Sequence, residues 1–473
     1  MRNSRDIIAL SPIRFGTSGA RGLVTALTDD VCFAYTLAFL QSITFGSRVA
    51  LGMDLRPSSP AIAGACAAAI RYAGLEVDFC GILPTPALAY YAQEQAIPAV
   101  MITGSHIPFD RNGVKFYRAS GEITKQDEID IIETHAMMPD VIGDVRLPEI
   151  NRLAYQGYIN RYVQFFSPQL LSGLRLGFYE HSSAAREILR EILQTLGAEV
   201  ISIGRTDKFV PIDTEAVSEH DARQAQQWAL DYGFDALLST DGDADRPLLG
   251  DECGHWLRGD VVGILCAQYL GAQAVATPVS SNTALELCQA FVVMRTRIGS
   301  PYVIAGMEEL TGRGHHAVVG FEANGGFLVA TALEKLGRRL KPLPTRDAVL
   351  PMLALLAMAK EGNIKLSGLS KHLPSRYTAS DRLAAFATEK SLRLLRMLAT
   401  SQAAVHDLLG DLCGFVNSQD QTDGLRLLFE NGEIVHLRAS GNAPELRCYA
   451  EADTQVRADE LVCICLSRLK SWL

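Results

Sequence analysis

Short apolar runs with strand character alternate with helical runs through most of this chain, and this alternation constrains the fold more than any other feature. It is typical of α/β layers built on mixed, mostly parallel sheets. The pattern recurs three times, about 100–150 residues apart, which predicts three related α/β domains. The strand-like runs lie at 48–54, 76–81 and 99–105, then at 174–180, 199–204 and 235–243, then at 274–282, 292–299 and 317–326, and the clearest helical runs are 59–74 and 184–197.

The last hundred residues follow a different pattern. Asn431-Gly432 stands between two β-type runs within 425–440, which is the strongest short-range signal for a hairpin. Residues 447–453 indicate another strand, and 459–473 indicate an amphipathic closing helix. We therefore expect a C-terminal α+β domain.

The boundary before this last domain is expected near 372–377. A segment containing Pro342 and Pro344, residues 338–347, lies ahead of it and is predicted to be a loop, because proline discourages helix. The chain has 473 residues, and a single core rarely grows past about 250–300. We expect four domains, at 1–148, 149–252, 253–374 and 375–473.

The composition argues against several classes of partner. Hydrophobic residues make up 48% of the chain, enough for several cores, and the formal net charge of −9 argues against nucleic-acid binding. The ten cysteines are scattered without a C-x-x-C pair, which indicates reduced thiols rather than a disulfide or zinc framework. The N-terminus lacks the apolar segment of a signal peptide, and no apolar run is long enough to span a membrane. We expect a cytoplasmic protein with no membrane partner.

An unusual cluster of charge occurs in TDGDADRP, residues 240–247, where Asp241, Asp243 and Asp245 directly follow a strand-like run. Ligands bind at the carboxyl ends of parallel strands, and carboxylate oxygens suit a hard cation such as Mg²⁺. An EF-hand loop is a rival interpretation, since Glu252 is the twelfth residue, but Arg246 occupies the position that requires glycine. A solvated acidic turn is the other alternative.

A second strand-like run ends in TGSHIPFDRNGVKFY, residues 103–117. Ser105 at such a strand end is exposed to a cleft, and Lys115, after a predicted Asn112-Gly113 turn, offers a cation close by. A serine with cations fits a phosphoserine, which carries about −1.5 to −2 charges. His106 beside Ser105 also suggests a hydrolase, but no G-x-S-x-G elbow is present. A plain surface loop remains the alternative.

Three further loops carry polar groups, and each has an ordinary turn as its alternative. FGTSGARGL, residues 15–23, supplies Thr17 and Arg21 as donors between glycines. GFEANGGF, residues 320–327, places Glu322 and Asn324 at a strand end, where they would suit sugar hydroxyls. RASGNAPELR, residues 438–447, is rich in donors and fits an anion-binding turn; these are Arg438, Ser440, Gly441, Asn442 and Arg447.

Together these five segments, in this order, resemble the α-D-phosphohexomutase family, which includes phosphomannomutase and phosphoglucomutase. The resemblance covers essentially the whole chain. It implies four domains around a central cleft: three related α/β domains and a smaller α+β domain. The chain departs from the family pattern at Ile107, where asparagine is usual, at Asn442 and Ala443, and in its sugar-recognition segment.

The resemblance also implies roles for the residues. Ser105 would be the phosphoserine, and Mg²⁺ would bind its phosphate together with Asp241, Asp243 and Asp245. The residues expected around the transferring phosphate are Arg21, His106, Lys115 and Arg246, and those expected to bind the substrate are Thr17, Gly299, Glu322, Asn324, Arg438, Ser440, Gly441, Asn442 and Arg447.

The predicted activity is the Mg²⁺-dependent interconversion of hexose 6-phosphate and hexose 1-phosphate. Mannose phosphate is the first choice and glucose phosphate the second, with a hexose 1,6-bisphosphate as intermediate and activator. The alternatives are a phosphoglucosamine mutase, a hexose-bisphosphate synthase or phosphatase, and a sugar-phosphate-binding protein without activity. The phosphorylated hexose is the expected partner, and monomer and dimer remain equally open.

Overall fold

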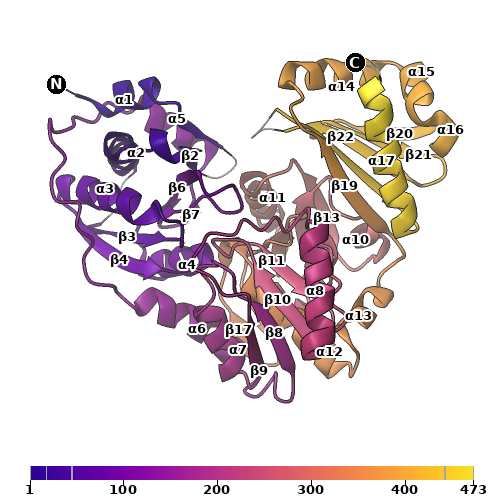
Figure 1. Ribbon diagram of the computed structural model, residues 1–473, viewed down its shortest axis with the longest axis horizontal. Helices are drawn as coiled ribbons and strands as arrows, with labels where there is room; N and C mark the ends of the chain where they lie inside the picture. The colour runs from indigo at the N-terminus through magenta and orange to yellow at the C-terminus, as the bar shows by residue number, and fades with distance from the viewer. Residues whose placement is uncertain (1, 17–18, 44–45, 441–443, 472–473) are drawn as a thin grey trace.

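The computed structural model describes residues 2–16, 19–43, 46–440 and 444–471, and its chain folds into four domains (Figure 1). Domain I is built on a mixed sheet in the order β1-β2-β6-β5-β3-β4, with β7 paired to β6. Strands β3, β4 and β5 are parallel, and the others are antiparallel. Its elements are α1 (Ser4–Leu10), β1 (Arg14–Phe15), β2 (Ala20–Leu23), η1 (Val24–Ala26), α2 (Asp29–Ser42), β3 (Arg48–Met53), α3 (Ser59–Tyr72), β4 (Glu76–Ile82), α4 (Thr85–Gln95), β5 (Ala99–Ile102), β6 (Arg111–Arg118), β7 (Gly121–Glu122) and α5 (Lys125–Glu133).

Domain II follows a linker, residues 139–152, that contains no helix or strand. Its sheet has the order β11-β10-β8-β9, in which β8 is parallel to both β9 and β10 and only β11 is antiparallel. Its elements are α6 (Leu153–Phe165), β8 (Arg175–Tyr179), α7 (Ile188–Thr195), β9 (Glu199–Ile203), α8 (Glu219–Tyr232), β10 (Ala236–Thr240) and β11 (Pro247–Gly250).

Domain III has a sheet in the order β13-β12-β14-β15-β18 and a separate hairpin of β16 and β17. Strand β12 is parallel to both β13 and β14. Its elements are α9 (Gly259–Leu270), β12 (Ala274–Pro278), α10 (Ala284–Leu287), β13 (Val292–Thr296), α11 (Ser300–Gly312), β14 (Val318–Phe321), β15 (Phe327–Val329), β16 (Leu333–Lys335), β17 (Arg338–Leu340), β18 (Leu343–Asp347), α12 (Val349–Glu361), α13 (Leu366–Leu369) and η2 (Ser370–His372).

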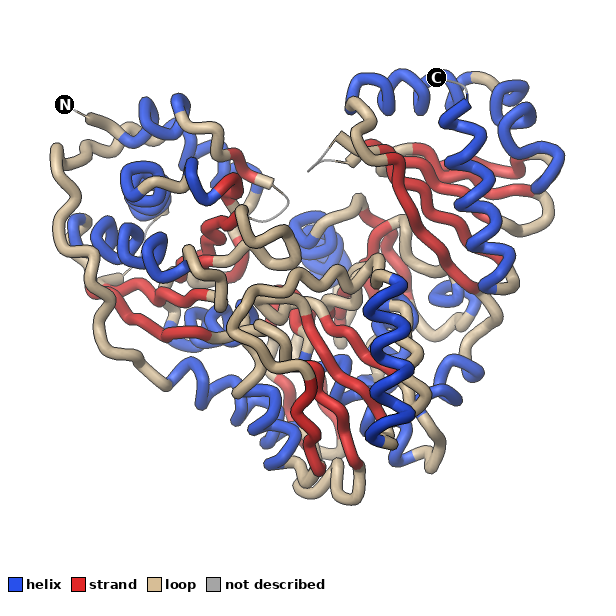
Figure 2. The backbone as a smooth tube through the Cα atoms, in the orientation of Figure 1, coloured by secondary structure: helices blue, strands red, loops and turns tan. Residues whose placement is uncertain are grey.

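Domain IV is α+β, with an antiparallel sheet in the order β19-β23-β22-β21-β20. Figure 2 shows helices packed along one side of this sheet. The predicted hairpin, the strand after it and the closing helix are confirmed as β21–β22, β23 and α17. The elements are β19 (Tyr377–Leu383), α14 (Thr388–Thr400), α15 (Gln402–Val405), η3 (His406–Gly410), α16 (Asp411–Cys413), β20 (Val416–Asp420), β21 (Leu425–Phe429), β22 (Ile434–Ala439), β23 (Leu446–Ala452) and α17 (Gln455–Ser471).

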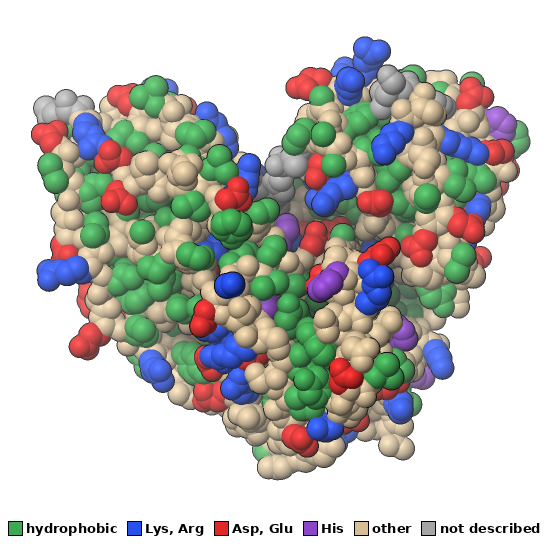
Figure 3. All heavy atoms as spheres, in the orientation of Figure 1, with side chains coloured by type: hydrophobic (Ala, Val, Ile, Leu, Met, Phe, Trp, Pro, Cys, Tyr) green, Lys and Arg blue, Asp and Glu red, His purple; other side chains and the backbone are tan. Residues whose placement is uncertain are grey.

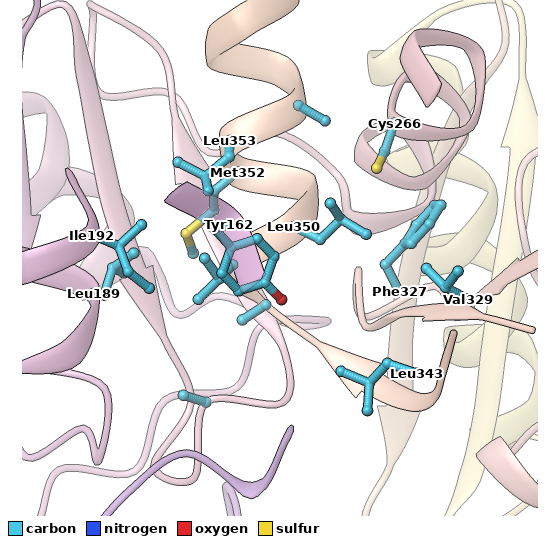
Figure 4. Close-up of a cluster of buried hydrophobic side chains, with 14 of the residues drawn as sticks. Tyr162, Leu189, Ile192, Cys266, Phe327, Val329, Leu343, Leu350, Met352 and Leu353 are labelled. Carbon is cyan, nitrogen blue, oxygen red and sulfur yellow. The ribbon is translucent and has the colours of Figure 1, made fainter. Parts of the chain in front are cut away.

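The hydrophobic cores divide the molecule unevenly. One continuous buried cluster runs from α4 of domain I through domain II into domain III, and it includes most of α12. Figure 4 shows this junction, where Leu350, Met352 and Leu353 of α12 lie between Leu189 and Ile192 of α7 and the strand side chains of domain III. Domain IV has a separate core of its own. Domains I to III are therefore joined by apolar packing, to which domain IV does not contribute.

Two local predictions are wrong. Residues 338–347 are not a loop, because β17 and β18 occupy most of the segment. Pro344 fits within β18 because β18 is the edge strand of its sheet, where a missing N–H is tolerated. Asn112-Gly113 is not a turn but part of β6, and a Cβ on Gly113 would lie 2.8 Å from the carbonyl oxygen of Ala20 on neighbouring β2.

Among the residues described, no helix is long and apolar enough to cross a membrane.

Candidate active site

Ser105 lies in a tight turn directly after β5, which we call the serine loop (residues 103–110). Its backbone has φ of 53°, in the left-handed region that serine rarely adopts. The prediction that Ser105 is exposed to a cleft is wrong, because its side chain is fully buried. The backbone N–H of Ser105 donates to Thr103 Oγ1 at 2.8 Å, which holds the turn. The hydroxyl donates to Asp241 Oδ2 at 2.6 Å, across 136 positions of sequence. The turn therefore directs the serine at the aspartate cluster.

The three aspartates form one buried group on the metal loop (residues 241–246), which joins β10 to β11. Their nearest carboxylate oxygens all lie within 4.8 Å of one another. Oδ1 of Asp243 and Oδ1 of Asp245 are buried and accept no hydrogen bond from any residue that the structure describes, although Arg246 Nε lies 3.5 Å from Asp245 Oδ1. Carboxylate oxygens left open in this way fit a hard divalent cation, so the residues present suit Mg²⁺.

The EF-hand interpretation is wrong, because the loop is flanked by two paired strands rather than by helices. Glu252, the twelfth residue, instead accepts a hydrogen bond from Ser367. The solvated acidic turn is also wrong, because Asp241, Asp243 and Asp245 are all at most 1% exposed.

Two buried cations balance part of this negative charge. Lys115 Nζ lies 2.7 Å from Asp243 and 3.0 Å from Asp245, and a nitrogen of the Arg346 guanidinium lies 2.7 Å from Asp245. Burial alone would raise the pKa of Asp245, but Arg346 and Lys115 bring it well below its ordinary value. Burial and the Asp243 carboxylate raise the pKa of Asp241 well above its ordinary value. Part of the negative charge of the three aspartates therefore stays unbalanced, and a further cation would compensate it.

Thr85, the first residue of α4, links the metal loop to domain I by two hydrogen bonds. Its hydroxyl donates to Asp243 Oδ2 at 2.6 Å, and its N–H donates to the Asp243 carbonyl at 2.9 Å. Sequence reasoning missed this residue, because a threonine at a helix start carries no chemical signal of its own.

His106 lies beside Ser105, and Arg21 and Arg246 lie near the same aspartates. His106 Nδ1 is 3.0 Å from Arg246, whose guanidinium also lies 3.5 Å from Asp245. The positive charge of Arg246, together with burial, holds the pKa of His106 well below its ordinary value, so the imidazole is neutral. Burial and Arg246 also lower the pKa of Arg21 to about 10. All the residues predicted around the transferring phosphate are thus brought together.

Arg56, which sequence reasoning also missed, holds the serine loop through hydrogen bonds to its backbone. Its guanidinium donates to the carbonyls of Ser105 at 2.8 Å and Ile107 at 2.6 Å, and it also bonds to those of Pro108 and Arg111. A Cβ on Gly104 would lie 2.6 Å from the Arg56 side chain, so only glycine fits there. The turn is thus supported through its backbone, and the apolar Ile107 does not disturb it.

Glu322 and Asn324 begin the sugar loop (residues 322–326) after β14. Both are buried, and Glu322 Oε2 lies 2.9 Å from Arg346. The Asn324 side chain accepts the N–H of Gly326 at 3.0 Å, as a turn residue does. Gly299 precedes α11 with φ of 127°, a conformation that favours glycine.

Arginines gather on domain IV around the phosphate loop (residues 438–447). In register, Arg438 of β22 faces Arg447 of β23, and Arg447 faces Arg382 of β19. Like charges placed directly opposite one another repel, and Glu445 balances part of this charge, at 3.4 Å from Arg382 and 3.5 Å from Arg447. The N–H of Ser440 donates to the Glu445 carbonyl at 2.9 Å. The predicted residues Thr17, Gly441 and Asn442 lie outside the described residues.

These arginines border cavities between domain IV and the rest of the chain. A cavity of about 430 Å³ is lined from three domains, by Lys125 of domain I, Arg297 of domain III and Arg438 of domain IV, among others. A cavity of about 710 Å³ is lined by Arg447 of domain IV and by Glu215 of domain II, among others. Figure 3 shows the surface hollowed between domain I at the left and domain IV at the right.

Four family models match consecutive parts of the chain. Residues 12–139, 155–254 and 258–377 match the phosphoglucomutase/phosphomannomutase alpha/beta/alpha domains I, II and III, and residues 382–463 match the C-terminal domain of the same family. The chain belongs to the phosphoglucomutase/phosphomannomutase family. The predicted family and the predicted fold class are both confirmed.

Relatives within the phosphoglucomutase/phosphomannomutase family match the full chain. A phosphomannomutase of Salmonella muenchen is 49% identical over 478 residues, covering 100% of this chain and 98% of the relative. A phosphomannomutase of Sinorhizobium fredii is 45% identical and covers 97% of this chain and 99% of the relative. Among solved structures, the Aspergillus fumigatus N-acetylphosphoglucosamine mutase in complex with GlcNAc-6P and magnesium has a TM-score of 0.59 at 15% identity, with 99% of this chain and 98% of that chain covered.

Proposed function

We propose that this protein interconverts hexose 6-phosphate and hexose 1-phosphate, with mannose phosphate as the preferred substrate, through a phosphoserine at Ser105 and Mg²⁺ held by Asp241, Asp243 and Asp245. The observation that carries the proposal is the 2.6 Å contact between Ser105 Oγ and Asp241, in which a serine hydroxyl lies against a buried carboxylate cluster. The two phosphomannomutases at 45% and 49% identity support mannose phosphate as the substrate.

The reaction needs two transfers. In the first, the phosphoryl group leaves Ser105 Oγ for a free hydroxyl of the hexose phosphate, which gives a hexose 1,6-bisphosphate. The bisphosphate then reverses its direction in the site, and its other phosphoryl group returns to Ser105. A hexose 1,6-bisphosphate added from outside would phosphorylate a resting enzyme by the same second step, so we propose it as the activator.

Phosphoryl transfer depends mainly on positioning and on neutralising the charge of the phosphoryl oxygens. A bound Mg²⁺ would contribute positive charge beside these oxygens. Lys115, Arg21 and Arg246 provide cations around the same point. His106 Nδ1 faces Arg246 and accepts from it, which places the proton of the neutral ring on Nε2 as a donor. We propose that this N–H binds a phosphoryl oxygen.

Substrate binding is proposed for the remaining predicted residues, including Thr17, which lies outside the described residues. Glu322 and Asn324 would contact sugar hydroxyls, and Gly299 would leave room for the sugar. The phosphate that is not transferred would lie on domain IV, held by Arg438, Ser440, Arg447 and, outside the described residues, Gly441 and Asn442. Arg382, opposite Arg447, joins this set. We keep 1–148, 149–252, 253–374 and 375–473 as the proposed domain limits, and a reducing compartment such as the cytoplasm suits ten free cysteines.

Replacing Ser105 tests the proposal. Incubation with mannose 1,6-bisphosphate should add the mass of one phosphoryl group to the wild type and to Ser47→Ala, which changes an exposed serine. Ser105→Ala should gain no such mass and should lose sustained turnover between mannose 1-phosphate and mannose 6-phosphate. Normal turnover by Ser105→Ala would exclude the phosphoserine, and release of free phosphate without isomerisation would indicate a phosphatase.

A further inference from the structure

Asp423 lies in the short turn between β20 and β21, and it contacts two different domains at once. Its Oδ1 accepts a hydrogen bond from Arg438 Nε at 3.2 Å within domain IV. Its Oδ2 accepts the backbone N–H of Ile298 at 2.8 Å, from domain III. The two oxygens of one carboxylate thus hold one residue on each side of the boundary between domains III and IV.

Both partners of Asp423 belong to the proposed substrate site. Arg438 is proposed to hold the phosphate that is not transferred, and Ile298 directly precedes Gly299 at the start of α11. All three of Asp423, Ile298 and Arg438 line the cavity of about 430 Å³ that is shared by domains I, III and IV. The carboxylate therefore lies at the edge of the space where the substrate is proposed to bind, and it is the only acidic side chain among the described residues that line this cavity.

The turn itself is built to fix the Asp423 carboxylate. The backbone carbonyl of Asp423 lies 2.5 Å from Nε2 of buried His436, two residues before Arg438 on β22. Gly424 has φ of 83°, and a Cβ there would lie 2.3 Å from the Leu437 carbonyl oxygen and 3.0 Å from Arg438 Cα. The turn therefore packs tightly on the strand that carries Arg438. The Asp423 side chain is only 13% exposed, so water competes weakly for its oxygens.

We propose that Asp423 is a positioning residue that orients Arg438 toward the substrate phosphate and links this arginine to the Gly299 turn. An arginine that is already oriented loses less side-chain entropy when the phosphate binds. The same carboxylate holds the turn at Ile298 in a constant position relative to Arg438. The groups proposed to bind the phosphate and those proposed to contact the sugar are therefore kept at a fixed separation. This inference rests on the proposed function, because it assigns the phosphate to domain IV.

The test compares three variants with the wild type. Asp423→Ala removes both contacts, and Asp423→Asn removes the charge that faces Arg438 while keeping an oxygen acceptor for the Ile298 N–H. Asp420→Asn removes a charge from the end of β20, next to the same turn, where the carboxylate accepts the nearby Thr422 N–H. Each protein is assayed for kcat and KM with mannose 1-phosphate and glucose 1-phosphate, and its affinity for mannose 6-phosphate is measured by calorimetry.

Asp423→Ala should raise KM and weaken calorimetric binding by about two- to tenfold, the effect expected for one side chain that is no longer held in place. It should also reduce the ratio of kcat/KM for mannose 1-phosphate to kcat/KM for glucose 1-phosphate. Asp423→Asn should weaken binding but keep this ratio, and Asp420→Asn should match the wild type. In an Arg438→Ala background, Asp423→Ala should weaken binding little further, because its effect on the phosphate acts through Arg438.

Several outcomes would overturn the inference. If Asp423 merely competes with phosphate for Arg438, Asp423→Ala would tighten binding instead. Unchanged binding, or a loss that adds fully to that of Arg438→Ala, would show that Asp423 does not act through the arginine. Absence of isomerase activity in the wild type would refute the proposed function alone, because the calorimetric comparison with mannose 6-phosphate still tests Asp423.

Discussion

Arg346 joins Asp245 and Glu322: its guanidinium lies 2.7 Å from the first carboxylate and 2.9 Å from the second. One buried cation thus connects the metal loop of domain II to the sugar loop of domain III, and all three side chains are at most 5% exposed. The same arginine therefore compensates negative charge in both loops.

Replacing Arg346 by methionine should destabilise the fold strongly. Two buried carboxylates would lose their common cation, and breaking a buried ion pair from one side typically costs about 3–5 kcal/mol of unfolding free energy. A urea titration should show a clearly lower unfolding midpoint. Arg339→Met, which changes an exposed arginine of β17, should leave the midpoint nearly unchanged. Equal midpoints for the two variants would show that Arg346 does not compensate this charge.

Asp243→Asn should weaken Mg²⁺ binding. Even outer partners of a metal ligand change affinity by about 10- to 100-fold, so loss of a ligand charge should cost at least as much. A calorimetric titration with Mg²⁺, and the dependence of turnover on Mg²⁺ concentration, measure the effect. Asp235→Asn at the opposite end of β10 removes an exposed charge and serves as the control. If both variants bound Mg²⁺ like the wild type, the aspartates would not be its ligands.

Arg447→Ala should mainly weaken the binding of phosphorylated ligands. Hydrogen bonds to charged groups contribute about 1.5–3 kcal/mol, so KM for mannose 1-phosphate should rise roughly tenfold or more. Inorganic phosphate should raise the unfolding temperature of the wild type and of Arg396→Ala, an exposed control on α14, more than that of Arg447→Ala. The same shift in all three proteins would place the anion elsewhere.

Stability should fall with pH below about 6.5 because of two buried histidines. Burial lowers the pKa of His181 and of His436 from 6.5 to about 4 in the folded chain. Each Nε2 faces a backbone carbonyl, and each Nδ1 is buried with no partner among the described residues. An unfolded chain therefore binds these protons first, so the stabilisation is complete above pH 6.5 and is lost as the pH falls toward 4.

The size of this pH effect follows from the shift. One pKa unit corresponds to about 1.4 kcal/mol, so each histidine should contribute up to about 3 kcal/mol by pH 4. Urea midpoints of the wild type and of His181→Gln, compared at pH 7.5 and pH 5, measure it. The variant should show a smaller drop between the two conditions. An identical drop would mean that His181 does not bind a proton on unfolding in this range.

The sequence analysis found those residues of the candidate site whose polar side chains directly follow a strand. Ser105 follows β5, the aspartates follow β10, and Glu322 follows β14, so a local pattern was enough to find them. The supporting residues have no such pattern. Arg56 matters because its guanidinium meets backbone carbonyls about fifty positions away, and Thr85 matters because α4 happens to start beside the metal loop.

The sequence analysis missed Arg346 for a further reason. It lies in 338–347, where two prolines favoured a loop over β18. Local propensity could not show that β18 is an edge strand, because strand order is decided by tertiary pairing. The same limit applies to the arginines of domain IV: only the register of β19, β22 and β23 shows that Arg382, Arg447 and Arg438 stand opposite one another.

The contact between Ser105 and Asp241 spans the linker 139–152, whose residues are mostly exposed. A break in the peptide chain within this linker would leave Ser105 and Asp241 on separate polypeptides. Because α4 of domain I shares one buried apolar core with domains II and III, the two fragments should stay associated after such a break. Limited proteolysis at the linker should therefore nick the chain without releasing domain I.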